Sequence, residues 1–151
     1  MKRQLAIEII CFLFIILFVY AALMKLLDVQ KFVVQLNQSP LLMVFGAWAA
    51  WGVPILELLI AISLIIGRLR LMALYASFTL MLIFTLYIIF ILTFAPQVPC
   101  SCGGILETMG WGEHLMFNAA FVALAVVGIF LLTHERELNA SPADEPKAIL
   151  S

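Results

Sequence analysis

Four long runs of apolar residues constrain this chain more than any other feature of its sequence. They cover residues 5–24, 41–66, 71–95 and 115–133. A helix needs about 20 apolar residues to cross the hydrocarbon layer of a bilayer, and each run reaches or nearly reaches that length. A helix also satisfies its own backbone polar groups, which lipid demands. We therefore predict an all-α polytopic membrane protein with a bundle of four transmembrane helices.

Composition supports a chain whose main partner is the lipid bilayer. The sequence is 66% hydrophobic and 11% charged, whereas soluble domains are about half apolar and about a quarter charged. It has no basic patch of the kind that binds nucleic acid, so we expect no such partner. The first run follows Lys2 and Arg3, but it is longer than the roughly 7–15 apolar residues of a signal peptide. We therefore expect it to be a retained membrane helix.

The distribution of basic residues predicts the orientation of the bundle. The N-terminus, the link between the second and third runs, and the C-terminal tail share one side, with Lys2, Arg3, Arg68, Arg70, Arg136 and Lys147. The other side carries Lys25 and Lys31. Because basic residues favour the cytoplasmic side, we place both termini in the cytoplasm of a bacterial inner membrane. The segment between the third and fourth runs then faces the periplasm, which is oxidising.

Two further segments complete the organisation of the chain. In the first outer loop, Leu27, Phe32, Val33 and Leu36 recur at helical spacing among polar residues. They predict a short interfacial helix, with an ordinary amphipathic connector as the alternative. Residues 139–151 are polar and rich in proline, which predicts a disordered cytoplasmic tail after a membrane domain of residues 1–138.

A Cys-x-Cys pair interrupts this apolar chain in the sequence PQVPCSCGG, residues 96–104. A disulfide between Cys100 and Cys102 would close a very small ring, and the resulting strain would make it labile and oxidising. A structural staple gains most from closing a long loop, so the spacing favours a reactive pair. Cys11 lies in the first run, near the opposite side of the membrane. We interpret Cys11 as a small apolar core residue.

Other groups on the outer side could assist such a pair. His114 begins the fourth run and could accept a proton from a thiol or act on it through its charge. Alternatively, its imidazole only makes a hydrogen bond at the membrane boundary. The two thiols, His114 and Met109 could also bind copper or zinc. They include only three strong ligands, however, and we predict no metal.

Charged and aromatic residues inside or beside the runs are further candidates. Glu57 lies near the middle of the second run, and a carboxylate within the membrane is a functional candidate by default. A purely structural role for Glu57 is equally compatible with its position. Lys25 and Asp28 could form an ion pair at the outer end of the first helix. Trp48, Trp51 and Trp111 suit an interfacial aromatic belt, although a quinone could also stack on them.

The chain resembles the MauE/DoxX-like redox-associated membrane proteins, which have four helices and cytoplasmic termini. The resemblance rests on YAALMKLLDVQKF, on PILELLIAISLIIGRLR, and above all on PCSCGG followed by GWGEHLMFN. It covers roughly residues 5–133 and fits the MauE branch better than the thiosulfate-oxidising DoxX branch, because of the outer cysteine pair.

This resemblance implies a function in forming or maintaining disulfides of periplasmic partners, as in the maturation of methylamine dehydrogenase. It implies that Cys100 and Cys102 are the redox pair, that Glu57 is the acid of the second helix, and that Lys25 is the basic residue ending the first. The chain is also similar to quinone-linked disulfide-forming proteins. It has Cys-x-Cys instead of their Cys-x-x-Cys and one outer pair instead of two, so a quinone step stays open.

Three hypotheses follow for the function. In the first, the protein is a membrane thiol–disulfide oxidoreductase that exchanges disulfides with envelope proteins. In the second, it is a non-enzymatic subunit or assembly factor that docks an envelope complex through the Cys-x-Cys loop. In the third, it handles a metal or a small solute. The partner, the direction of electron flow and the oligomeric state do not follow from the sequence.

Overall fold

The computed structural model describes residues 2–37, 46–94 and 110–140, and these residues form five helices. Four are long, and the second is short. In chain order they are α1 (Lys2–Leu27), α2 (Val29–Asn37), α3 (Gly46–Ile65), α4 (Arg70–Phe94) and α5 (Trp111–Ala140). The described residues include no strand, and four of the helices are long and apolar enough to cross a membrane. The prediction of an all-α bundle with four membrane-spanning helices is confirmed.

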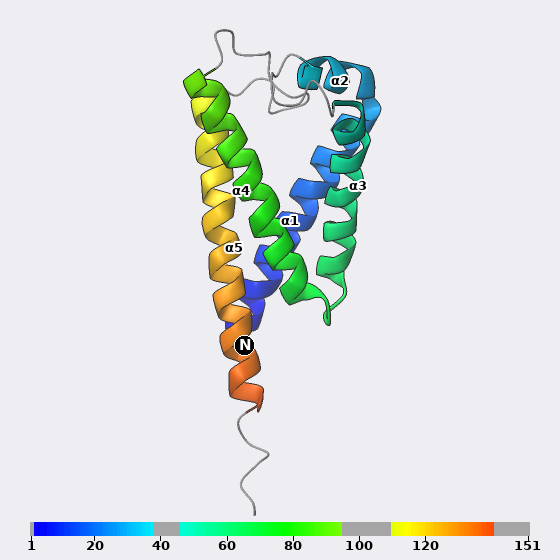
Figure 1. Cartoon of the computed structure of the whole chain (residues 1–151). Helices are drawn as coiled ribbons and strands as arrows, with labels where there is room; N and C mark the ends of the chain where they lie inside the picture. Colours follow the sequence, from blue (N-terminus) through cyan, green and yellow to red (C-terminus); the bar gives the residue numbers. More distant parts are fainter. Residues whose placement is uncertain (1, 38–45, 95–109, 141–151) are drawn as a thin grey trace, which may run out of the picture.

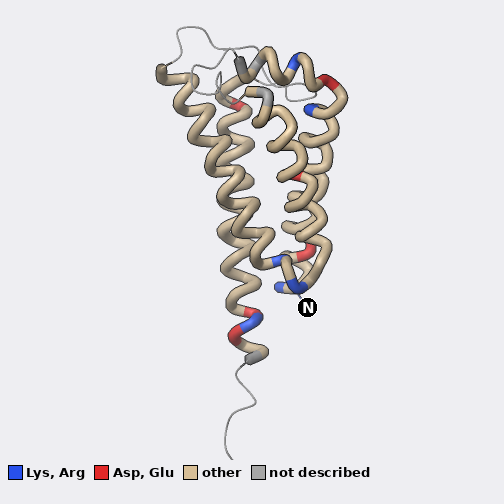
Figure 2. Tube along the Cα trace, turned by 45° about the vertical axis from the view of Figure 1, so that its right-hand side comes forward, with Lys and Arg blue, Asp and Glu red and all other residues tan. Residues whose placement is uncertain are grey.

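The four long helices alternate in direction, so the bundle has two distinct ends (Figure 1). At one end, α1 finishes, α2 lies across the bundle, α3 starts, α4 finishes and α5 starts. We call this the α2 end. At the other end, α1 starts, α3 turns into α4, and α5 finishes. We call it the basic end, because its described charged residues include Lys2, Arg3, Arg68, Arg70 and Arg136. Charged residues lie mainly toward these two ends (Figure 2).

Two of the long helices, α1 and α5, extend at both ends past the apolar runs that predicted them. The run of residues 5–24 becomes Lys2–Leu27, and that of residues 115–133 becomes Trp111–Ala140. Polar residues at a helix end can reach the interfacial water, so the helix need not end where its apolar residues end. The runs 41–66 and 71–95 correspond to Gly46–Ile65 and Arg70–Phe94. Residues 38–45 and 141–151 lie outside the described ranges, and the predicted disordered tail stays a prediction.

The short helix α2 agrees with the interfacial helix expected in the first outer loop. It begins after Asp28, whose Oδ1 accepts a hydrogen bond from the backbone N–H of Lys31 at 3.3 Å. This is the usual role of a side chain that caps a helix N-terminus. Phe32 and Leu36 are buried and pack against Ala50 of α3. Asp28 therefore starts α2, and the apolar face of α2 covers the start of α3.

The core of the bundle consists of apolar side chains where α1 meets the other long helices. Phe14 and Phe18 of α1, Leu64 of α3 and Leu74 of α4 are almost fully buried. At Gly128 of α5, a β-carbon in place of the glycine hydrogen would lie 3.1 Å from Cγ2 of Ile10 and 3.5 Å from Leu74. Because a side chain at this position would push against two neighbours, a glycine there lets α5 approach α1 and α4 closely.

Hydroxyl groups within the long helices bond to their own backbone. Ser77 is buried in α4, and its Oγ donates to the carbonyl of Ala73 at 2.7 Å. The Thr85 hydroxyl donates to the carbonyl of Met81 at 2.7 Å in the same way. This pattern satisfies a hydroxyl without a partner from another helix. These residues are therefore structurally accounted for and leave other polar side chains as the candidates for function.

Candidate functional site

Lys25 and Glu57 form an ion pair inside the bundle, close to the α2 end. The Nζ of Lys25, near the end of α1, bonds to Oε1 of Glu57 in α3. The Glu57 side chain is 0% exposed, and that of Lys25 is 15% exposed. The expected pairing of Lys25 with Asp28 is wrong, since Lys25 pairs with Glu57 and Asp28 caps α2. The acid of the second apolar run thus has a specific basic partner on the first.

The opposite directions of α1 and α3 explain how these two residues meet. Side chains of a helix lean toward the N-terminus of that helix. Lys25 is near the end of α1, so its side chain leans back into the bundle. Glu57 is in the second half of α3, so its side chain leans toward the α2 end. A lysine can therefore reach from the outer part of one helix to a carboxylate deeper in its antiparallel neighbour.

The ammonium group of Lys25 lies close to aromatic rings of two further helices. It lies 5.8 Å from the ring centre of Phe32 in α2 and 5.2 Å from that of Phe84 in α4. These distances are within the range of cation–π attraction. Its charge also acts on the imidazole of His114 at the start of α5. With Glu57 in α3, the Lys25 ammonium therefore contacts residues of three other helices, α2, α3 and α4. We call Lys25, Glu57, Phe32, Phe84 and His114 the Lys25 cluster.

Two buried polar atoms have no hydrogen-bond partner among the described residues. One is Oε2 of Glu57, the carboxylate oxygen that does not face Lys25. The other is Nδ2 of Asn118, a residue that is 4% exposed and lies one helical turn after His114. An unpaired buried polar atom costs about 1–3 kcal/mol. An unpaired buried polar atom in a native structure calls for an explanation, so both side chains are candidates for function. Asn118 cannot be found from the sequence, because one asparagine among apolar residues gives no specific signal.

His114 is held in place by the cap of α5. The backbone N–H of Gly110 donates to Oε2 of Glu113 at 3.1 Å, and the N–H of His114 donates to the carbonyl of Gly110 at 3.0 Å. A glutamate that bonds back to the start of its helix is one half of a capping box. Glu113 therefore has a structural role. It positions the first turn of α5, and with it the partly buried His114.

The three cysteines differ in what the structure describes. Cys11 is 3% exposed within the core of α1, so its interpretation as a small core residue is confirmed. Cys100 and Cys102 lie outside the described residues, as do Glu107 and Met109. They belong to the segment that joins the end of α4 to the start of α5, and both of those helix ends are at the α2 end.

Other candidates from the sequence do not converge on the Lys25 cluster. Among residues 2–37, 46–94 and 110–140, no three His, Cys, Asp or Glu side chains lie close enough together to hold a metal. Trp48 is 83% exposed and Trp51 is 54% exposed on α3. Such exposure suits an aromatic belt at the membrane surface. Nothing in the geometry of these two tryptophans favours a quinone stacked on them.

The geometry fixes the Lys25 ammonium at the α2 end, where it is paired with the Glu57 carboxylate. Lys25 is oriented by an ion pair and two aromatic rings, so its position requires little further ordering when a charged group approaches. A nearby ammonium favours the thiolate form of a cysteine, which is the reactive form. The partly buried His114 at the start of α5 is a group that can exchange a proton. This arrangement can therefore support nucleophilic chemistry of thiols that reach this end of the bundle.

Comparison with protein families identifies one match, and it covers most of the chain. The family model described as methylamine utilisation protein MauE matches residues 3–131. The matched range includes all members of the Lys25 cluster as well as the Cys-x-Cys pair. Comparisons with curated proteins and with solved structures gave no match.

Proposed function

Because the chain belongs to the MauE family, we propose that it is a membrane thiol–disulfide exchange protein that acts through Cys100 and Cys102. The observation that carries this proposal is the Lys25 ammonium, held by Glu57 at the α2 end. The cysteine pair is tethered to this end through α4 and α5. Since an extended chain covers at most about 3.5 Å per residue, Cys100 can lie no more than roughly 20 Å from the end of α4.

The proposed exchange balances without any further reactant. A thiolate of the partner protein attacks one sulfur of the Cys100–Cys102 disulfide and forms a mixed disulfide, releasing the other cysteine as a thiolate. The partner's second thiolate then attacks the mixed disulfide. The partner gains a disulfide, and the pair ends as two thiols that hold the two electrons and two protons. The reverse exchange would reduce a partner disulfide through the same bonds.

Lys25 and His114 support these steps in different ways. In the proposal, the Lys25 charge stabilises the thiolate released when the disulfide is attacked. His114 exchanges a proton with the same sulfur as it changes between thiolate and thiol. Glu57 holds Lys25 in place and is a positioning residue.

We further propose that the α2 end faces the periplasm, since the described basic residues at the other end outnumber those at the α2 end.

Trapping of mixed disulfides tests the proposal directly. Cys100→Ser and Cys102→Ser each leave a single thiolate, which can attack a disulfide of the partner by the reverse exchange and form a mixed disulfide, releasing one partner sulfur as a thiolate. The missing cysteine can then no longer resolve this bond from within the pair. We expect one of them to accumulate an adduct with an envelope protein that dithiothreitol releases. Cys11→Ser is the matched control and should exchange normally. If neither single variant gives an adduct and the double variant leaves the redox state of envelope proteins unchanged, the proposal is wrong.

The same cells distinguish exchange from docking and test the orientation. A non-enzymatic assembly factor would hold its partner without covalent exchange, so the partner would still co-purify with the double serine variant. A membrane-impermeant maleimide, applied to intact spheroplasts after reduction, should label Cys100 and Cys102 if the α2 end faces outward. Labelling only after the membrane is broken would contradict that orientation.

A further inference from the structure

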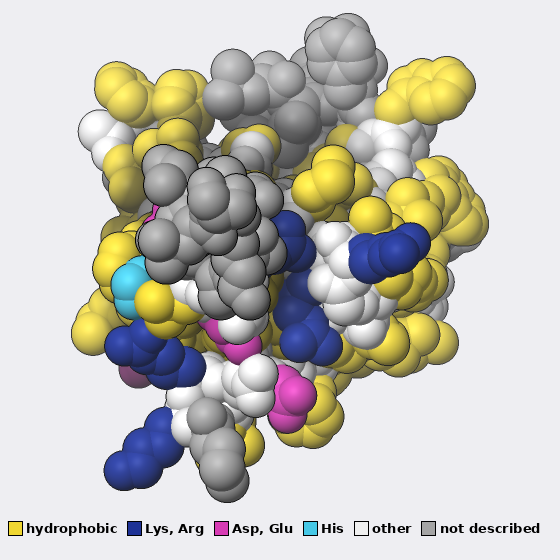
Figure 3. Space-filling model, turned by 90° about the horizontal axis from the view of Figure 1, so that it is seen from below, with side chains coloured by type: hydrophobic (Ala, Val, Ile, Leu, Met, Phe, Trp, Pro, Cys, Tyr) yellow, Lys and Arg dark blue, Asp and Glu magenta, His cyan; other side chains and the backbone are white. Residues whose placement is uncertain are grey.

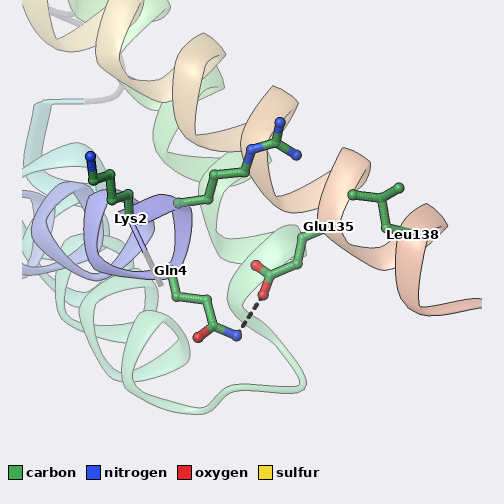
Figure 4. A pocket seen from close by; sticks show the side chains of 5 residues that line it. Lys2, Gln4, Glu135 and Leu138 are labelled. Atoms are coloured by element: carbon green, nitrogen blue, oxygen red, sulfur yellow. Dashed lines mark hydrogen bonds between the residues drawn. The ribbon is translucent and has the colours of Figure 1, made fainter.

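At the basic end, a groove lies between the first turn of α1 and the last turns of α5 (Figure 4). It has a volume of about 320 Å³ and is lined by Lys2, Arg3, Gln4, Glu135 and Leu138. The side-chain amide of Gln4 donates to Oε1 of Glu135 at 2.8 Å. This bond joins the two helix ends and occupies one oxygen of Glu135, the one carboxylate among the described residues that line the groove. The groove is therefore formed by two helices that a hydrogen bond holds together.

The groove has an excess of positive charge that the described residues do not neutralise. Neither Lys2 nor Arg3 forms an ion pair within the described ranges. The first turn of α1 contains no acidic residue, so its free N–H groups add partial positive charge. Seen from this end, Lys and Arg side chains lie at several places on the face of the bundle, with Asp and Glu side chains beside some of them and hydrophobic side chains toward the rim (Figure 3). An anion would be attracted to the groove by charges on side chains and backbone together.

An apolar stripe leads from this groove along the outside of α1. Leu5, Ile9, Phe12 and Ile16 are all more than half exposed. They follow Lys2 at intervals of three or four residues, so they lie on the same face of the helix as Lys2. On α5, Leu138 in the groove and Phe130 two turns earlier are 55% and 68% exposed. A charged groove that continues into an apolar stripe matches an amphiphile better than it matches a soluble anion.

We propose that this groove is a binding site for an anionic glycerophospholipid. The phosphate of the headgroup is held by Lys2, Arg3 and the N–H groups at the start of α1. The acyl chains lie along the stripe of Leu5, Ile9, Phe12 and Ile16. Basic pockets between membrane helices on the cytoplasmic side are suited to such headgroups. The bound lipid bridges the start of α1 and the end of α5 beside the Gln4–Glu135 bond, and so stabilises the closed bundle.

Lipid titration followed by native mass spectrometry tests the site. The full-length protein is purified in a neutral detergent and titrated with dioleoyl phosphatidylglycerol or with dioleoyl phosphatidylcholine. We expect the anionic lipid to bind more tightly. Lys2→Gln/Arg3→Gln should weaken its binding roughly 25-fold, about fivefold for each charge near a membrane surface. Arg68→Gln/Arg136→Gln removes the same charge from the same end but does not line the groove, and it should weaken binding less than about threefold.

Two outcomes would overturn the proposal. If both double variants weaken binding equally, the effect is the general charge of the basic end and the groove is not a site. If the groove variant binds phosphatidylglycerol as tightly as the unaltered protein, Lys2 and Arg3 do not hold the headgroup. Competition identifies the ligand, because sodium phosphate and glycerol 3-phosphate at millimolar concentration should leave lipid binding unchanged. Full displacement by either would assign the groove to a soluble anion and contradict the lipid site.

Discussion

Replacement of Lys25 by methionine (Lys25→Met) separates the structural role of the ion pair from its role in function. Methionine keeps the length and apolar stem of lysine but removes the ammonium, which leaves Glu57 fully buried without its partner. Removing one member of a buried ion pair typically costs about 3–5 kcal/mol, because the remaining charge is uncompensated. The lost attraction to Phe32 and Phe84 is part of this cost.

Glu57→Leu should cost less than Lys25→Met. The Lys25 side chain is 15% exposed and lies near the end of α1, so an unpaired ammonium can turn toward the interfacial water. Long basic side chains commonly reach the interface in this way. The Glu57 side chain is 0% exposed and has no comparable route to water. We therefore expect a loss of about 1–3 kcal/mol for Glu57→Leu, the usual cost of leaving one buried polar group without a partner.

The double variant Lys25→Met/Glu57→Leu should be nearly as stable as the unaltered protein, because apolar residues of similar volume can replace a buried ion pair without loss. Stability is measured by unfolding in mixed micelles with increasing dodecyl sulfate, and a double-mutant cycle gives the coupling energy. Since the two single effects sum to at least about 4 kcal/mol and the double variant loses almost none of it, we expect a coupling of about 4 kcal/mol or more. If the two single effects simply add, the ion pair does not control stability and the reasoning is refuted. If the double variant is stable but no longer forms a mixed disulfide with a partner protein, the Lys25–Glu57 ion pair is required for function.

The remaining predictions concern the core. Gly128→Leu should destabilise the bundle by about 1–3 kcal/mol, because the larger side chain overpacks against Ile10 and Leu74. At Gly52 an added β-carbon would have no atom within 4 Å, so Gly52→Ala should change stability by less than about 0.5 kcal/mol. Equal effects of the two substitutions in the same micelle unfolding assay would contradict the close approach of α5. Cys11 is buried, so membrane-permeant N-ethylmaleimide should modify it only when the protein unfolds. The Cys100→Ser/Cys102→Ser variant keeps Cys11 as its one cysteine and serves for this measurement. Rapid modification of that variant in its folded state would show that α1 is not packed as described.

The fold could be predicted from sequence in most respects, and the candidate site only in part. Each apolar run in the sequence corresponds to one long helix, because the thickness of the bilayer relates run length directly to a membrane span. The short helix α2 was predictable from the spacing of Phe32 and Leu36. Lys25 and Glu57 were both recognised as unusual, one at the end of a run and the other inside one. Their pairing does not follow from the sequence, which offers Asp28 as a possible partner for Lys25 because it is closer in the chain.

The missed pairing has a physical reason. Lys25 and Glu57 lie on separate helices, and whether they meet depends on the rotation of each helix about its own axis and on their relative heights. Those quantities are decided by core packing around Phe14, Phe18 and Leu64, and no short sequence motif encodes them. The same reason applies to Asn118, whose burial depends on which face of α5 is turned toward the bundle.

The sequence by itself determined the number of membrane spans and the separation of a basic end from an end that holds the Cys-x-Cys pair. These properties depend on hydrophobic length and on charge along the chain, and the bilayer acts on each span almost independently. Only the tertiary structure decided that the Lys25 ammonium contacts Glu57, Phe32 and Phe84 and acts on His114, and that Lys2 and Arg3 share a groove with α5. Contacts between helices arise from how their surfaces pack together, and packing selects one set of neighbours from many that the same four spans would allow.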